Sequence, residues 1–143
     1  MKEITLNFDG YYKYENVSDG YFAKSGVYCV YAGKYNQTID KVSLRQLLYI
    51  GEGGDVLLRL SNHEKLSLWK SYLQVGETLW ISVAFINSED RERAEAACIF
   101  EHQPICNNQC TKCFNYEDTK IVTSGGNSKL KSDFIVKKET TLE

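Results

Sequence analysis

Apolar residues along the chain gather in short runs separated by polar segments. The runs at residues 26–32, 47–51 and 79–86 are rich in valine, isoleucine, tyrosine and tryptophan, which favours strands. The first two runs are joined by a polar loop of moderate length at residues 33–43, which favours an antiparallel pair. The chain before Asp19 is polar and rich in tyrosine, and indicates an extended arm or an edge strand.

Helical patterns follow the second and third of these strands. Asp55 is a good N-cap for a helix that begins at the next residue and reaches His63. Apolar residues at helical spacing predict a second helix at residues 66–75. A third helix is expected at residues 89–103, where acidic residues in the first turn suit the helix dipole and Pro104 ends the element.

This order of elements predicts an α+β fold with a small, mostly antiparallel three-stranded central sheet flanked by helices. A length of 143 residues suits a single domain over residues 1–143, with a C-terminal extension at residues 108–143. A Gly125-Gly126 turn in that extension fits a final hairpin. The chain has neither an apolar run of roughly 20 residues nor a secretory signal, so we expect a cytoplasmic protein without a membrane partner.

The net charge of the chain adds little to these predictions. The net charge is −2 and the pI about 5.8, which argues against a protein that coats nucleic acid through bulk charge. A local patch that touches a few phosphates remains compatible with these values. Lysines of the C-terminal extension could form such a patch, but we favour a solvated surface for them. They are Lys120, Lys129, Lys131, Lys137 and Lys138.

Two tripeptides carry the first sign of chemistry. They are Gly26-Val27-Tyr28 and Tyr49-Ile50-Gly51, one on each of the first two strands. Either tripeptide alone occurs by chance, and each tyrosine alone would fit a half-buried position on a strand. The residues that follow them argue against a chance occurrence.

Three further features follow these tripeptides at characteristic spacings in the sequence. Arg59 stands ten residues after Tyr49, on the first predicted helix, and Glu95 lies on the helix after the third strand. Pro104 and Asn107 follow Glu95 at nine and twelve residues. Together with the two tripeptides, this series resembles the GIY-YIG nucleases over residues 26–107.

The resemblance implies a GIY-YIG-like catalytic domain and a specific activity. It predicts an endonuclease that hydrolyses phosphodiester bonds, with DNA favoured over RNA, using one Mg²⁺ or Mn²⁺ ion. Tyr28 would be the general base, Tyr49 would hydrogen-bond the water or the phosphate, and Arg59 would stabilise the phosphate. Glu95 would bind the metal ion.

Physical chemistry supports these roles. Arg59 offers a planar, permanently charged fork for phosphate oxygens, and a single carboxylate with several waters is a typical Mg²⁺ arrangement. A tyrosine pKa lies near 10, so a tyrosinate at Tyr28 needs Arg59 and the metal ion nearby. His63 is four residues beyond Arg59, so we expect both on one helix face, with His63 orienting or deprotonating the water.

Three residues are expected to support the site. Gly26 and Gly51 belong to the two tripeptides, and Gly51 would let the backbone approach the substrate closely. Asn107 would tie the loop after the third helix to the site. The chain departs from the family in two respects: Tyr28 and Tyr49 are 21 residues apart, about twice the shortest spacing, and Glu52 stands where several members carry lysine.

Two other hypotheses remain open. One is a catalytically silent nucleic-acid-binding module on the same fold. The other is an interaction protein stabilised by zinc, since three thiolates and an imidazole suit Zn²⁺, although we favour free thiols in a loop. The zinc ligands would be His102, Cys106, Cys110 and Cys113.

Overall fold

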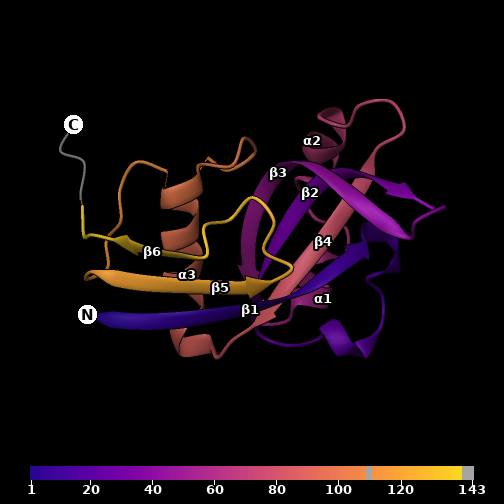
Figure 1. Ribbon diagram of the computed structural model, residues 1–143. Coiled ribbons are helices and arrows are strands. Elements are labelled where there is room, and N and C mark those ends of the chain that lie inside the picture. Colours follow the sequence, from indigo (N-terminus) through magenta and orange to yellow (C-terminus); the bar gives the residue numbers. More distant parts are fainter. Residues whose placement is uncertain (109–110, 140–143) are drawn as a thin grey trace.

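A curled six-stranded mixed sheet dominates the computed structural model, which describes residues 1–108 and 111–139 (Figure 1). The strand order across the sheet is β3-β2-β4-β1-β5-β6. The strands are β1 (Lys2–Lys13), β2 (Gly26–Asn36), β3 (Lys41–Gly53), β4 (Thr78–Phe85), β5 (Thr119–Gly125) and β6 (Asp133–Val136). Within the described residues the helices are α1 (Val56–Leu60), α2 (Leu66–Ser71) and α3 (Ser88–His102), with 3-10 turns η1 (Tyr14–Asn16) and η2 (Gly20–Phe22).

The predicted three-stranded sheet flanked by helices is wrong. Strands β2, β3 and β4 do pair antiparallel, but β1, β5 and β6 continue the same sheet. Strand β1 is also not an edge strand, because it lies between β4 and β5 and runs parallel to β5. Its buried residues Ile4, Leu6 and Phe8 alternate with exposed polar ones, which is the pattern of a strand with one buried face.

The polar stretch at residues 33–43 is also not a loop. Strands β2 and β3 continue through most of it, and only residues 37–40 turn between them. The side chains of this hairpin end are largely exposed. Polar composition therefore reflects a hairpin that extends into solvent, and the predicted antiparallel pairing of its strands is confirmed.

The helices agree with prediction in part. The side chain of Asp55 accepts the Leu58 N–H at 3.0 Å, which confirms it as the N-cap of α1. Helix α1 nevertheless ends at Leu60, and α2 is shorter than the apolar spacing suggested. Helix α3 follows its predicted span closely, and a left-handed Gln103 terminates it just before the proline.

The sheet is covered on both faces. Residues that alternate along β2 point to opposite sides: Cys29 packs in the cluster that contains α3, and Tyr28 in the cluster that contains α1 and α2. Strand β3 is an edge of the sheet, so its outer edge lies between these two helical layers. Within the described residues, no helix combines the length and the apolar character needed to cross a membrane.

Candidate active site

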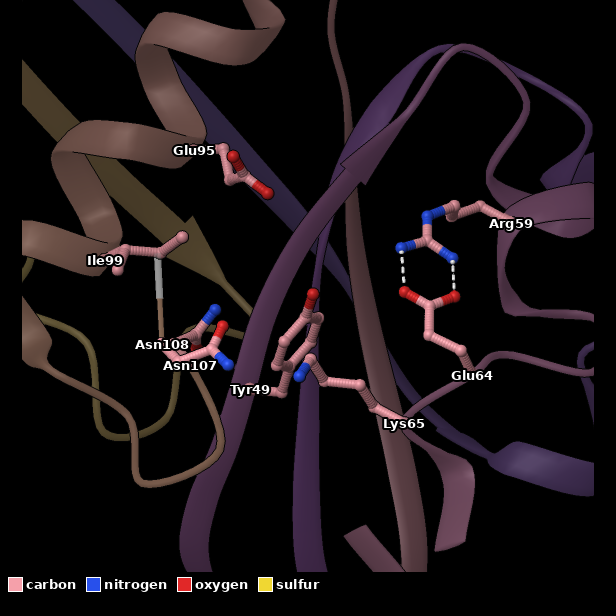
Figure 2. Close-up of a pocket in the computed structure, with 8 residues that line it drawn as sticks. All are labelled: Tyr49, Arg59, Glu64, Lys65, Glu95, Ile99, Asn107 and Asn108. Atoms are coloured by element: carbon pink, nitrogen blue, oxygen red, sulfur yellow. Dashed lines mark hydrogen bonds and ion pairs between the residues drawn. The ribbon is translucent and has the colours of Figure 1, made fainter. Parts of the chain in front are cut away.

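Two pockets that share three lining residues lie along the outer edge of β3. The shared residues are Tyr49, Arg59 and Glu95, and the pocket volumes are about 240 and 270 Å³. Glu95 approaches from α3 on one side of β3 and Arg59 from α1 on the other, with Tyr49 between them (Figure 2). The first pocket is also lined by Glu64, Lys65, Ile99, Asn107 and Asn108. The second is also lined by Tyr28, Glu52, Glu92, Ala96 and Tyr116.

Glycines leave room for the functional side chains at this edge. Gly51 pairs with Tyr28 across the two strands, and a Cβ at Gly51 would lie 2.4 Å from the Tyr28 hydroxyl oxygen. The Tyr28 ring therefore occupies the space that any larger residue at position 51 would need. A Cβ at Gly53 would lie 3.0 Å from Arg59 Cβ, whereas Gly26 faces the Ala84 carbonyl oxygen and serves packing between strands.

Tyr28 and His63 form a buried pair beside the second pocket. The Tyr28 hydroxyl oxygen lies 3.0 Å from His63 Nε2, and His63 Nδ1 accepts the Lys65 backbone N–H at 3.0 Å. Because Nδ1 accepts, the neutral ring carries its proton on Nε2 and donates it to Tyr28. Burial and the charge of Arg59 lower the pKa of His63 to about 4, so the ring is neutral at physiological pH.

The expected helix face shared by Arg59 and His63 does not exist. Helix α1 ends before His63, and Asn62 adopts a positive φ of 55° that turns the chain inward. His63 is only 4% exposed, with its ring centroid 4.5 Å from that of Trp69 and 5.5 Å from that of Tyr49. In this geometry His63 reaches the pocket through the hydroxyl of Tyr28 rather than through its own nitrogens.

Arg59 presents a guanidinium whose fork is filled by a carboxylate. It donates to both oxygens of Glu64, at 2.7 and 2.8 Å (Figure 2). This bidentate pair lowers the pKa of Glu64 to about 2, and the Glu64 side chain is 63% exposed. A phosphate presents two oxygens to a guanidinium in the same manner. An exposed carboxylate in that position is therefore one that a phosphate can replace.

Glu95 lies in a cluster of like charges. Burial, together with the neighbouring carboxylates of Glu52 and Glu92, raises the pKa of Glu95 to about 7, against the lowering influence of Arg59. Glu52 is itself held by Arg91, which donates to it through a 2.5 Å hydrogen bond. The pocket thus contains more negative charge than its own cations balance.

Burial makes both tyrosine hydroxyls weaker acids than a free phenol, and Tyr28 is the weaker acid of the two. Burial, followed by the charge of Glu95, raises the pKa of Tyr49 to about 12. Burial, followed by Tyr49, raises the pKa of Tyr28 well above its ordinary value, while Arg59 opposes this shift. Both phenols are consequently protonated at neutral pH unless additional positive charge enters the pocket.

Asn107 binds backbone rather than solvent. Its Oδ1 accepts the Ile50 N–H and its Nδ2 donates to the Ile50 carbonyl, each at 2.9 Å. The Cys106 N–H donates to the Leu48 carbonyl at 2.9 Å. These bonds attach the segment after α3 to the free edge of β3 and fix α3 relative to the strand that carries Tyr49.

The residues of the zinc hypothesis do not converge. His102 uses both ring nitrogens within the protein: Nδ1 bonds to the Cys98 carbonyl and Nε2 accepts the Lys131 N–H, each at 2.9 Å. Cys106 is buried under β3, and Cys110 lies outside the described residues. Over residues 1–108 and 111–139, no group of three or more His, Cys, Asp or Glu side chains is arranged to hold a metal ion.

Several residues at the pockets escaped sequence reasoning. Glu64 and Lys65 lie in the turn between α1 and α2, where no periodic pattern marks a function. Tyr116 comes from the C-terminal extension, and only the folded topology brings it beside α3.

Comparisons of this chain with protein-family models, with curated proteins and with solved structures found no match.

Proposed function

We propose that this protein is a metal-dependent endonuclease that hydrolyses phosphodiester bonds in DNA, as the resemblance to GIY-YIG nucleases implies. One observation carries the proposal. Two phenols, a guanidinium and a carboxylate, from β2, β3, α1 and α3, line one pair of pockets at the edge of β3. These are groups that can bind a phosphate, accept a proton and hold a cation.

The donor set suits a divalent cation with much of its water retained. Glu95 is the pocket carboxylate that the series of motifs singled out, and its pKa of about 7 reflects burial first and then repulsion by Glu52 and Glu92. A bound cation relieves that repulsion, and Mg²⁺ commonly uses one or two carboxylates and several waters. Glu95 would hold the ion, which would supply charge neutralisation at the phosphate and favour ionised groups around it.

Side chains of the protein would carry out the individual steps of hydrolysis. Arg59 receives two oxygens of the scissile phosphate in the place that Glu64 occupies in the free protein. Once its phenol proton has passed to solvent, Tyr28 as the tyrosinate accepts the proton of the attacking water; the His63 N–H bonded to its oxygen and the charge of Arg59 favour this ionised form. The water oxygen bonds to phosphorus, the phosphorus–oxygen bond to the leaving group breaks, and that oxygen takes a proton from solvent.

Cleavage assays test this proposal directly. Purified protein is incubated with end-labelled single-stranded, duplex and branched DNA, and with matched RNA, in Mg²⁺, Mn²⁺ or excess chelator. We expect metal-dependent cleavage that Glu95→Gln reduces by about 10² to 10³-fold. Glu89→Gln is the matched control, because Glu89 is exposed on the same helix and lines neither pocket.

Two results would refute the proposal. One is cleavage by Glu95→Gln at the rate of the unmodified protein. The other is binding of DNA with no cleavage under any metal tested, which would instead support the silent binding module.

A further inference from the structure

The first pocket extends along β3 beyond the groups assigned to the scissile phosphate. From Arg59 and Glu95 it continues past Tyr49 to Lys65, Asn107 and Asn108 (Figure 2). Its volume is about 240 Å³, whereas a water molecule takes about 30 Å³ in the liquid. The pocket as a whole, from Arg59 to Lys65, therefore has room for an anion and several waters.

Lys65 is the cation of this end. Its backbone is fixed on both sides, because its N–H donates to His63 and its carbonyl accepts the Trp69 N–H at 2.9 Å. Its side chain extends along Tyr49 into the pocket (Figure 2). Throughout residues 1–108 and 111–139, no carboxylate forms an ion pair with its ammonium group.

Other lysines are placed differently. Three from the C-terminal extension, Lys131, Lys137 and Lys138, pair with carboxylates on the protein surface. Asn107 is a neutral amide whose oxygen and nitrogen both bind Ile50, so it brings no charge that would pair with Lys65. Lys65 thus combines a rigid backbone, an unpaired ammonium group and a position in the same pocket as Arg59.

We propose that the Lys65 end of the pocket is a subsite for the backbone phosphate next to the scissile one. The inference rests on the proposed nuclease function, because it assigns the ligand as a polynucleotide strand. Arg59 and Lys65 both line this pocket beside Tyr49 and would contact successive phosphates. A Lys contact to phosphate adds affinity for any sequence and increases the salt dependence of binding.

The test compares a strand with a dinucleotide. Binding of a short fluorescent thymidine oligonucleotide, and competition by a thymidine dinucleotide with one phosphodiester, are measured without divalent ions. We expect Lys65→Met to weaken strand binding about three- to tenfold and to reduce the slope of log affinity against log salt by about 0.7. The loss for the dinucleotide should be smaller, and Lys65→Arg should restore strand binding.

Lys70→Met is the matched control, since Lys70 is exposed on α2 and lines neither of the two pockets. Equal losses in Lys65→Met and Lys70→Met would overturn the subsite, as would equal losses for strand and dinucleotide. Lys65-dependent strand binding by a protein that never cleaves would refute the nuclease and keep the subsite. Cleavage that is indifferent to Lys65→Met would keep the nuclease and refute the subsite. Melting temperatures of all variants exclude unfolding as the cause of any loss.

Discussion

Tyr28 and Tyr31 lie three residues apart on β2, are both fully buried at 0% exposure, and point to opposite faces of the sheet. The Tyr31 hydroxyl donates to the Ser128 carbonyl at 2.6 Å, and its ring packs edge-on against Tyr11. The Tyr28 hydroxyl instead meets a histidine side chain and lines a pocket at the sheet edge.

Burial alone does not distinguish the two tyrosines. In both, burial is the main cause that raises the pKa of the phenol well above its ordinary value. The difference lies in what surrounds each hydroxyl: Tyr31 donates to a backbone carbonyl, whereas Tyr28 bonds the His63 side chain, packs against Gly51 and lines the second pocket. A buried tyrosine therefore becomes a candidate for chemistry only when it also lines a pocket.

Replacing each tyrosine by phenylalanine should separate the two roles with the largest effect. Tyr28→Phe removes the proposed general base and should lower the rate of DNA cleavage by about 10² to 10⁴-fold. Tyr31→Phe leaves the Ser128 carbonyl without its partner and should cost about 1–3 kcal/mol of unfolding free energy. Cleavage rates and urea unfolding curves of both variants check the comparison.

The opposite pattern would break the comparison. If Tyr31→Phe lost cleavage while remaining folded, or Tyr28→Phe kept the full rate, the assignment of the catalytic face would be wrong.

Gly51→Ala should disturb the Tyr28 side without removing any functional group. The added Cβ would lie 2.4 Å from the Tyr28 hydroxyl oxygen and 2.4 Å from ring atom Cζ, so the ring must shift. We expect about a hundredfold loss of cleavage, as displaced catalytic groups commonly cause. Gly20→Ala is the control, because a Cβ there meets nothing within 4 Å. Comparable losses in both variants would argue against a specific clash.

The pH dependence of metal binding should show the charge cluster on the α3 side of the site. Burial, Glu52 and Glu92 raise the pKa of Glu95 to about 7, so the carboxyl is protonated below that pH and binds metal poorly. Affinity for Mg²⁺ should therefore rise roughly tenfold per unit as the pH approaches about 7 from below, then level off. Titration calorimetry at several pH values measures this rise.

Glu52→Gln removes one cause of the raised pKa of Glu95. The rise in Mg²⁺ affinity should then shift to lower pH. The same linkage applies to stability: without metal, folding is favoured while Glu95 is protonated and loses that contribution as the pH rises from about 4.5 through about 7. If Mg²⁺ affinity rises over the same pH range in Glu52→Gln as in the unmodified protein, Glu52 does not influence the pKa of Glu95.

Local patterns made part of the fold predictable. Strands β2 and β4, and helix α3 with its ending at Gln103, follow from β-branched runs, helix spacing and capping residues. Because two of its three buried positions, Thr119 and Thr123, are polar, strand β5 is indicated only by the Gly125-Gly126 turn of a final hairpin, and its antiparallel pairing with β6 is confirmed. Its parallel pairing with β1 joins Lys2 to Thr119, and no local pattern encodes a contact across that separation.

The candidate site divides in the same way. Tyr28, Tyr49, Arg59 and Glu95 could be named because their order and spacing along the sequence resemble a known series of motifs. Glu64 could not, because it reaches Arg59 only after the chain leaves α1 and turns. The position of His63 was predicted wrongly for the same reason, since helix spacing does not apply beyond the end of a helix.

The smallest expected effect concerns the anion that occupies Arg59. Glu64→Gln removes the charge that competes with phosphate, and exposed ion pairs are worth at most about 1 kcal/mol, so strand affinity should rise about three- to fivefold. Glu77→Gln is the control for loss of a two-bond arginine pair, because Glu77 bonds Arg45 through both oxygens outside both pockets, with its side chain 3% exposed against 63% for Glu64. Binding of a labelled oligonucleotide without divalent ions measures both variants. If strand affinity rises only in Glu64→Gln, the arginine–carboxylate pair at Arg45 stabilises the fold, whereas the pair at Arg59 competes with phosphate for the guanidinium. If strand affinity rises in neither variant, phosphate does not take the place of Glu64.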